Sequence, residues 1–204
     1  MRLWKSFRVQ RRDEISYYDT MGEFEAERFA VNLNQLIAEA MAEKQKAGVI
    51  FLCIGTDRST GDSLGPLIGH KLRDLGQKNE RVQVVGTLDC PVHAMNLEQA
   101  IFMVRRCYPD HVIVAVDASV GRSEHVGCVT LGKGALRPGL GVCKELQAVG
   151  DIFITGIVGG CGSCDPLMLQ SVRLSVVMRM ADYICDSVRQ ALVPEPHNFC
   201  RRVL

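Results

Sequence analysis

Hydrophobic residues occur along this chain in two patterns, continuous runs and runs with helical spacing. The continuous runs predict buried strands: 49–54 (VIFLCI), 82–86 (VQVVG), 111–116 (HVIVAV, ending at Asp117) and 151–160 (DIFITGIVGG). Apolar residues three or four positions apart predict helices over 24–46, 62–75, 95–107 and 167–192. Apolar strands that alternate with helices are typical of a mostly parallel sheet covered on both faces. The expected fold class is therefore α/β, a three-layer α/β/α sandwich.

The remaining segments have weaker patterns. Residues 125–132 (HVGCVTLG) alternate and are expected to form an edge strand. Residues 1–22 are polar and basic without a clear period, which predicts a loosely attached arm and a single domain over 23–204. Glycine and proline break 134–142 into a loop, and the end of the chain is expected to be a short tail.

Composition and charge narrow the class of protein. The formal net charge is only +1, and acids and bases are interspersed, so neither nucleic acid nor an anionic membrane is an expected partner. The N-terminus has no apolar core for a signal peptide, and the apolar runs are too short to span a membrane. The nine cysteines are an odd number in a chain that is not small, so most are expected to be reduced thiols. We expect a soluble, intracellular protein.

Polar residues gather after the predicted strands, where ligands bind in open α/β sheets. The candidates, in chain order, are Asp57, Arg58, Ser59, Thr60, Asp62, Asp89, His93, Asp117, Ser119, Cys161, Cys164 and Asp165. The first loop lacks both phosphate-binding glycine motifs, and an aspartate at a helix start would repel phosphate. Nucleotide binding is therefore not expected. Structural roles are open for two aspartates: Asp62 can cap a helix, and Asp117 can hold the turn after its strand.

The alternative interpretation gives the same two aspartates a shared catalytic role. Adjacent parallel strands lie about 4.8 Å apart, so loops that leave neighbouring strands can bring two carboxyl groups to one water molecule. Two carboxyl groups that close share one proton. The ionised member then removes a proton from water while the neutral member polarises a peptide carbonyl, as in aspartic proteases. The residues alone do not decide between this pair and two structural carboxylates.

Four segments together resemble the YyaC family of sporulation proteins from spore-forming Firmicutes. They are 53–66 (CIGTDRSTGDSLGP), 86–97 (GTLDCPVHAMNL), 112–122 (VIVAVDASVGR) and 151–160 (DIFITGIVGG). The resemblance runs from about Val49 to the last predicted helix. That family is similar to the germination protease, which degrades small acid-soluble spore proteins, and more distantly to hydrogenase maturation endopeptidases. The resemblance implies a phosphorylase/hydrolase-like fold.

The resemblance also implies roles for single residues. The germination protease motifs G-[LI]-G-x(6)-D-x-L-G-P and I-D-[AS] carry its proposed catalytic aspartates, which match Asp62 and Asp117. Hydrogenase proteases sense nickel with a further histidine, but the corresponding stretch here, 138–145 (PGLGVCKE), has none. The implied activity is thus an aspartic-type endopeptidase acting on a protein substrate, without a cofactor or a required metal, in the cytoplasm of a sporulating cell or forespore. A non-catalytic sporulation protein and a metal-sensing maturation protease are the alternatives, and a homo-oligomer is left open.

Other residues are candidates for supporting roles. Asp57, Arg58, Asp89 and His93 are candidate substrate-binding residues, and Arg58 in particular can stabilise a developing oxyanion. A histidine such as His93 more often simply bonds the backbone of its own turn. Cys161 and Cys164 have the C-x-x-C spacing of a redox pair or half a zinc site, but the sequence has no second C-x-x-C.

Overall fold

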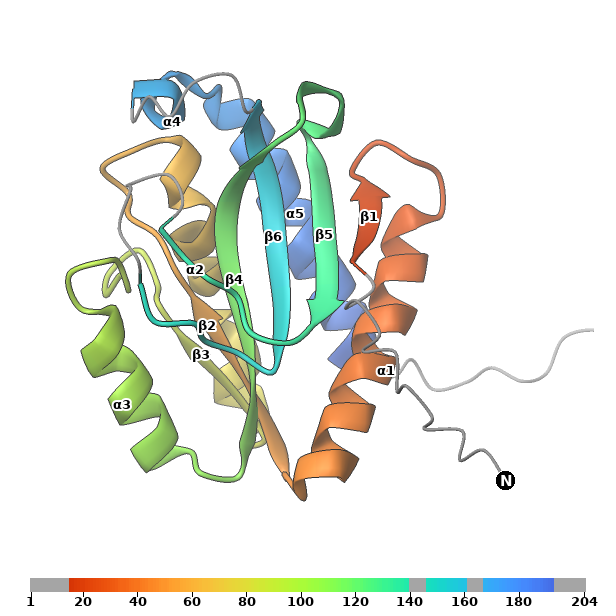
Figure 1. Ribbon diagram of the computed structural model, residues 1–204. Coiled ribbons are helices and arrows are strands. Elements are labelled where there is room, and N and C mark those ends of the chain that lie inside the picture. Colours follow the sequence, from red (N-terminus) through yellow and green to blue (C-terminus); the bar gives the residue numbers. More distant parts are fainter. Residues whose placement is uncertain (1–14, 140–145, 161–166, 193–204) are drawn as a thin grey trace, which may run out of the picture.

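A six-stranded sheet with helices on both faces forms the centre of the computed structural model, which describes residues 15–139, 146–160 and 167–192 (Figure 1). Its strands are β1 (Ser16–Asp19), β2 (Gly48–Cys53), β3 (Val82–Val85), β4 (His111–Gly121), β5 (Cys128–Lys133) and β6 (Ile152–Gly160). Its helices are α1 (Glu25–Lys44), α2 (Leu64–Lys78), α3 (Leu97–Cys107), α4 (Leu167–Ser171) and α5 (Leu174–Leu192), with 3-10 turns η1 (Gly61–Ser63) and η2 (Ser123–His125). The predicted α/β class and three-layer arrangement are confirmed.

The strand order is β1-β5-β6-β4-β2-β3. The four strands predicted from continuous apolar runs, β3, β2, β4 and β6, lie side by side and run parallel. The other two pairs, β5 with β6 and β1 with β5, are antiparallel. The carboxyl ends of four strands therefore meet at one edge of the sheet, where ligands bind in folds of this kind.

Each face of the sheet has its own hydrophobic core. In β4, Val112, Val114 and Val116 pack with the buried sides of α1, α2 and α5. The alternate residues Ile113 and Ala115 pack with α3 on the opposite face. Continuous apolar strands follow directly from this arrangement, because side chains on both faces are buried.

The N-terminal segment and β5 differ from the sequence-based expectations. The expected edge strand, β5, lies inside the sheet, because β1 pairs along its outer side from Ser16 to Asp19. Tyr18 is fully buried and its ring meets that of Phe29 edge to face, with ring centroids 5.0 Å apart. Ser16–Asp19, within the segment expected to be a loose arm, is thus an integral strand.

Two element boundaries were also wrong. The third predicted strand does not end at Asp117, because β4 continues to Gly121 while β6 pairs with it up to Gly160. The predicted helix 167–192 is two helices with a break at residues 172 and 173. The break lets α4 lie over η1, where a Cβ on Gly61 would approach the Leu169 carbonyl oxygen to 2.8 Å.

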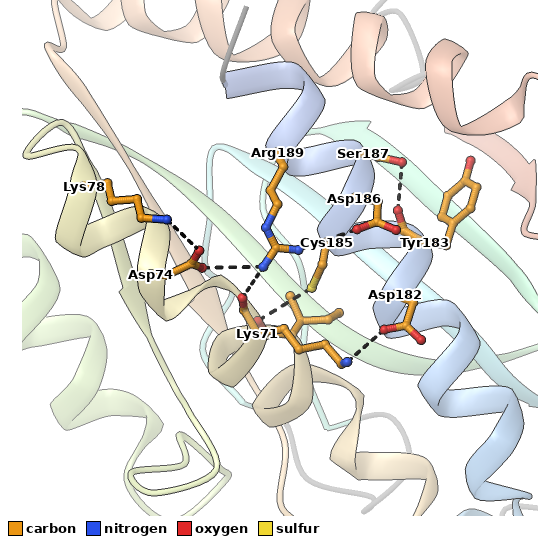
Figure 2. A network of polar contacts seen from close by, with 10 residues as sticks. Lys71, Asp74, Lys78, Asp182, Tyr183, Cys185, Asp186, Ser187 and Arg189 are labelled. Atoms are coloured by element: carbon orange, nitrogen blue, oxygen red, sulfur yellow. Dashed lines mark hydrogen bonds and ion pairs between the residues drawn. The ribbon is translucent and has the colours of Figure 1, made fainter. Parts of the chain in front are cut away.

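Helix α2 is fixed against α5 by polar contacts along their shared side (Figure 2). The Arg189 guanidinium donates to the carbonyl of Lys71 and lies 3.5 Å from the Asp74 carboxylate. Lys71 in turn pairs with Asp182 of α5 at 2.8 Å. These contacts hold the middle of α2 in place, and η1, which contains Asp62, comes directly before the start of this helix.

Candidate active site

A cavity of about 100 Å³ opens at the carboxyl ends of the parallel strands. Four candidate residues line it, namely Asp62, His93, Asp117 and Ser119, and they come from two separate loops and from β4. Its remaining walls are Ile54, Gly55, Ala94, Ala118, Val120, Leu136, Arg137, Pro138, Gly139, Leu146 and Leu169. A cavity of this size holds several water molecules. The described residues thus bring the two predicted aspartates to one site.

Asp62 reaches the cavity because the loop after β2 folds back on itself. The Thr56 N–H donates to the Asp62 carbonyl at 3.1 Å. Gly55 has a φ of +140°, and a Cβ there would lie 2.1 Å from that same carbonyl oxygen, so only glycine fits. Asp62 lies in η1, before α2 begins, and Ser63 occupies the N-cap position. The predicted start of the α-helix at Asp62 was therefore wrong, and the alternative in which Asp62 caps the helix is not observed.

Asp117 occupies an interior position of β4 and is only 6% exposed. Its Oδ1 accepts a hydrogen bond from the next backbone N–H, that of Ala118, at 2.8 Å. The expected carboxylate-to-backbone bond therefore exists, although it lies within a strand instead of a turn. One such bond leaves other acceptor positions of the carboxyl group unused, so Asp117 has capacity for further partners in the cavity.

The two carboxyl groups influence each other's ionisation. Burial raises the pKa of Asp117 well above its ordinary value, the charge of Asp62 raises it further, and the Ala118 N–H lowers it. Burial also raises the pKa of Asp62, while the Thr56 N–H and His93 act in the opposite direction. Asp117 therefore keeps its proton to higher pH than Asp62 does, so one ionised and one neutral carboxyl group coexist over a range of pH.

His93 contributes a hydrogen-bond donor. Its Nδ1 accepts a hydrogen bond from the Met95 N–H at 3.3 Å, and the backbone N–H of His93 donates to Asn96 Oδ1 at 2.8 Å. The expected bonding of this histidine to its own turn is thus present. Because Nδ1 is an acceptor, the neutral imidazole carries its proton on Nε2. His93 both anchors its loop and lines the cavity.

The other substrate-binding candidates lie elsewhere. Asp57 and Arg58 are exposed and are not among the residues that line the cavity. Asp89 is also exposed and pairs with Arg73 of α2 at 3.0 Å, not with His93. Cys161, Cys164 and Asp165 lie outside the described residues. Within the described ranges, no group of three His, Cys, Asp or Glu side chains is arranged to hold a metal ion.

One wall of the cavity consists of residues that the sequence did not mark as candidates. Leu136–Gly139 come from the glycine- and proline-broken segment after β5, Leu146 lies further along the chain before β6, and Arg137 is a cation among them. A backbone pairing between Leu136 and Val149 holds this segment against the sheet. The only available signal was an arginine next to Pro-Gly, which marks a loop but not its position. The candidate Ser119, which also lines the cavity, donates to Thr155 Oγ1 at 3.2 Å.

Comparisons with known proteins agree with the proposed relationship. The sequence profile of the family described as "Protein of unknown function (DUF1256)" matches residues 22–187. The chain is 40% identical over 159 residues to the uncharacterized protein YyaC of Bacillus subtilis (strain 168), which covers 78% of this chain and 77% of that protein. No helix in the described ranges is both long and apolar enough to cross a membrane. The chain belongs to the YyaC family, whose sequence profile is DUF1256.

Proposed function

We propose that this protein is an aspartic-type endopeptidase in which Asp62 and Asp117 form the catalytic pair. The observation that carries the proposal is the placement of both carboxyl groups in one cavity, where burial raises the pKa of each and the charge of Asp62 raises the pKa of Asp117 further. Perturbed carboxyl groups in a cleft are typical of catalytic sites. The resemblance to the germination protease supports the proposal, because it implies that the proposed catalytic aspartates of that enzyme correspond to these two positions.

The unequal ionisation assigns a role to each carboxyl group. Asp62 loses its proton first, so it is the general base that removes a proton from a water molecule in the cavity. Asp117, still neutral, donates a hydrogen bond to the carbonyl oxygen of the scissile peptide and polarises it. Activity then requires ionised Asp62 and neutral Asp117, so it rises with pH through the first ionisation of the pair and falls through the second.

His93 and Arg137 complete the proposed site as sources of positive charge or hydrogen bonds. His93 lowers the pKa of Asp62, which keeps that carboxylate ionised, and so available as a base, from a lower pH upward. Arg137 lines the same cavity. A guanidinium or an Nε2–H donor near the carbonyl can stabilise negative charge that develops in the transition state. The substrate is a protein, and the family resemblance makes small acid-soluble spore proteins the first to test.

The test is mass-spectrometric detection of cleavage in purified small acid-soluble spore proteins and in a random decapeptide library. Wild type is compared with Asp62→Asn and Asp117→Asn, each checked for folding by circular dichroism. We expect cleavage by wild type and at least about a hundredfold loss in each variant, the scale on which acid–base groups contribute. Absence of cleavage by folded wild type across pH 4–9 (roughly the range set by ordinary and raised carboxyl pKa values) would favour a non-catalytic binding protein.

A further inference from the structure

Strand β4 extends beyond its neighbour β2 at the edge of the cavity. The last paired residues of β2 and β4 are Cys53 and Val116, followed by one hydrogen bond from the Ile54 N–H to the Val116 carbonyl at 2.7 Å. On its other side, β4 stays paired with β6 up to Gly121. No strand in the described ranges pairs with the β2 side of β4 after Val116. Within the described ranges, residues 117–121 of β4 therefore bound a vacant strand position beside the two aspartates.

The direction of the backbone groups along β4 follows from its hydrogen bonds. The Ile113 carbonyl accepts from the Asp151 N–H on the β6 side, whereas the Val116 carbonyl accepts from Ile54 on the β2 side. Backbone groups alternate in direction along a strand. Ala118 and Val120 therefore direct their N–H and C=O groups into the vacant position. The pairing of β4 with β6 shifts at one point: Ser119 pairs with Ile157, and Val120 pairs with Gly159. The extra residue is therefore in β6, and the alternation along β4 continues.

The same backbone groups border the cavity. Asp117, Ala118, Ser119 and Val120 all line it. Ile54 and Gly55, which directly follow the end of β2, line the same cavity. At present the Ala118 N–H is used by Asp117 Oδ1. Among the described residues, no backbone hydrogen bond outside the strands uses the Ala118 carbonyl or the Val120 N–H, an acceptor and a donor spaced as in a sheet.

We propose that an extended polypeptide segment binds in this vacant position as an additional strand on β4, with its backbone paired to Ala118 and Val120. The inference rests on the proposed function. It describes the substrate as an extended chain that is recognised mainly through its backbone. Main-chain pairing to a free strand edge is an established mode of peptide recognition. It places a peptide unit next to Asp117, within the cavity that Asp62 also lines. Folded proteins would bind only through segments that can extend.

The test removes the Val120 N–H. Val120→Pro deletes this donor and fills its place with the proline ring, which an edge strand tolerates where the N–H faces away from its paired neighbour. Val120→Ala keeps the N–H and measures the contribution of the side chain alone. With the random decapeptide library, we expect kcat/KM for Val120→Pro at least about tenfold below that of Val120→Ala, the equivalent of one lost hydrogen bond. Equal activities in two folded variants overturn the inference and leave the peptidase proposal intact.

A second measurement does not depend on catalysis. Backbone amide exchange is followed by NMR in ¹⁵N-labelled Asp62→Asn protein, with and without the unlabelled decapeptide library. We expect the Val120 amide to exchange about tenfold more slowly with the library present, as a newly formed hydrogen bond of about 1.4 kcal/mol requires. If wild type cleaves nothing, or if Val120→Pro does not fold, this result decides: slowed exchange supports the strand-binding position, and unchanged exchange contradicts it.

Discussion

At the scale of single residues, the site consists of two carboxyl groups that the fold makes unequal. Asp117 is almost fully buried inside a strand, whereas Asp62 lies in a turn near His93 and the Thr56 N–H. Burial of Asp117 disfavours its charge and so costs stability at neutral pH, which is characteristic of residues kept for function. Asp62 and Asp117 thus differ in proton affinity because of where the chain places them.

A stability measurement tests the burial of Asp117. Since the folded pKa of Asp117 lies above the unfolded value of about 3.9, the native state binds more protons than the unfolded chain between the two values. The free energy of unfolding of wild type should therefore fall as pH rises through that window. Asp117→Asn removes this contribution, so its stability relative to wild type should increase from about pH 4 upward, by about 1.4 kcal/mol for each unit of pKa elevation.

Urea unfolding of both proteins at a series of pH values gives the comparison directly. Asp62→Asn serves as a reference, because the pKa of Asp62 is also raised but this residue is less buried than Asp117. A stability difference between Asp117→Asn and wild type that stays constant from pH 4 to 8 (about the window of raised carboxyl groups) would contradict the assigned burial.

At the scale of elements, glycines let α2 and the loop before it approach β2 closely enough to position Asp62. A Cβ on Gly65 would lie 2.0 Å from the Ile54 carbonyl oxygen, a backbone atom that cannot move aside easily. The sequence predicted the helix and the strand here, because both have clear periodicity. It did not predict that η1 precedes the helix or that β4 extends beyond the end of β2, because strand ends depend on pairing between distant segments.

Two glycines of α2 provide a matched pair of variants. Gly65→Ala should destabilise the protein by about 1–3 kcal/mol and reduce the proposed peptidase activity, because overpacking must displace α2 from β2. Gly76→Ala lies near the other end of α2, where a Cβ would make only ordinary contacts, the nearest with the Val82 carbonyl oxygen at 3.4 Å. That change should stabilise by up to about 1 kcal/mol through helix propensity. Thermal unfolding measures both, and equal effects would mean that close packing at Gly65 does not matter.

At the scale of the whole molecule, β1 closes one side of the sheet by pairing with β5. The polar, basic composition of residues 1–22 concealed this strand, since only Tyr18 of β1 is buried. The ring of Tyr18 packs on Phe29, and its hydroxyl accepts from Asn32 at 2.7 Å. A four-residue strand with one inward side chain has too little alternation to be recognised from sequence. The parallel strands, in contrast, could be predicted from continuous apolar runs, and the two aspartates from the motifs that contain them.

Adjacent tyrosines in β1 separate core packing from surface contact. Tyr18→Ala should lower the free energy of unfolding by about 3–5 kcal/mol, the range for buried aromatic residues. Tyr17 is 45% exposed. Among the described residues its ring contacts one other ring, that of His125, with centroids 4.7 Å apart. Tyr17→Ala should cost less than about 1 kcal/mol. Denaturant unfolding of the two variants would contradict a structural role for β1 if the costs were equal and small.

The central claim is that Asp62 and Asp117 act as one coupled pair, and a carboxyl titration tests it most directly. Side-chain ¹³C shifts of both aspartates are followed by NMR against pH in wild type and in Asp62→Asn. We predict that Asp117 titrates well above its ordinary value in wild type, and at lower pH in Asp62→Asn because the charge of Asp62 is gone. A titration of Asp117 near its ordinary value of about 3.9, or one that Asp62→Asn leaves unchanged, would contradict the pair.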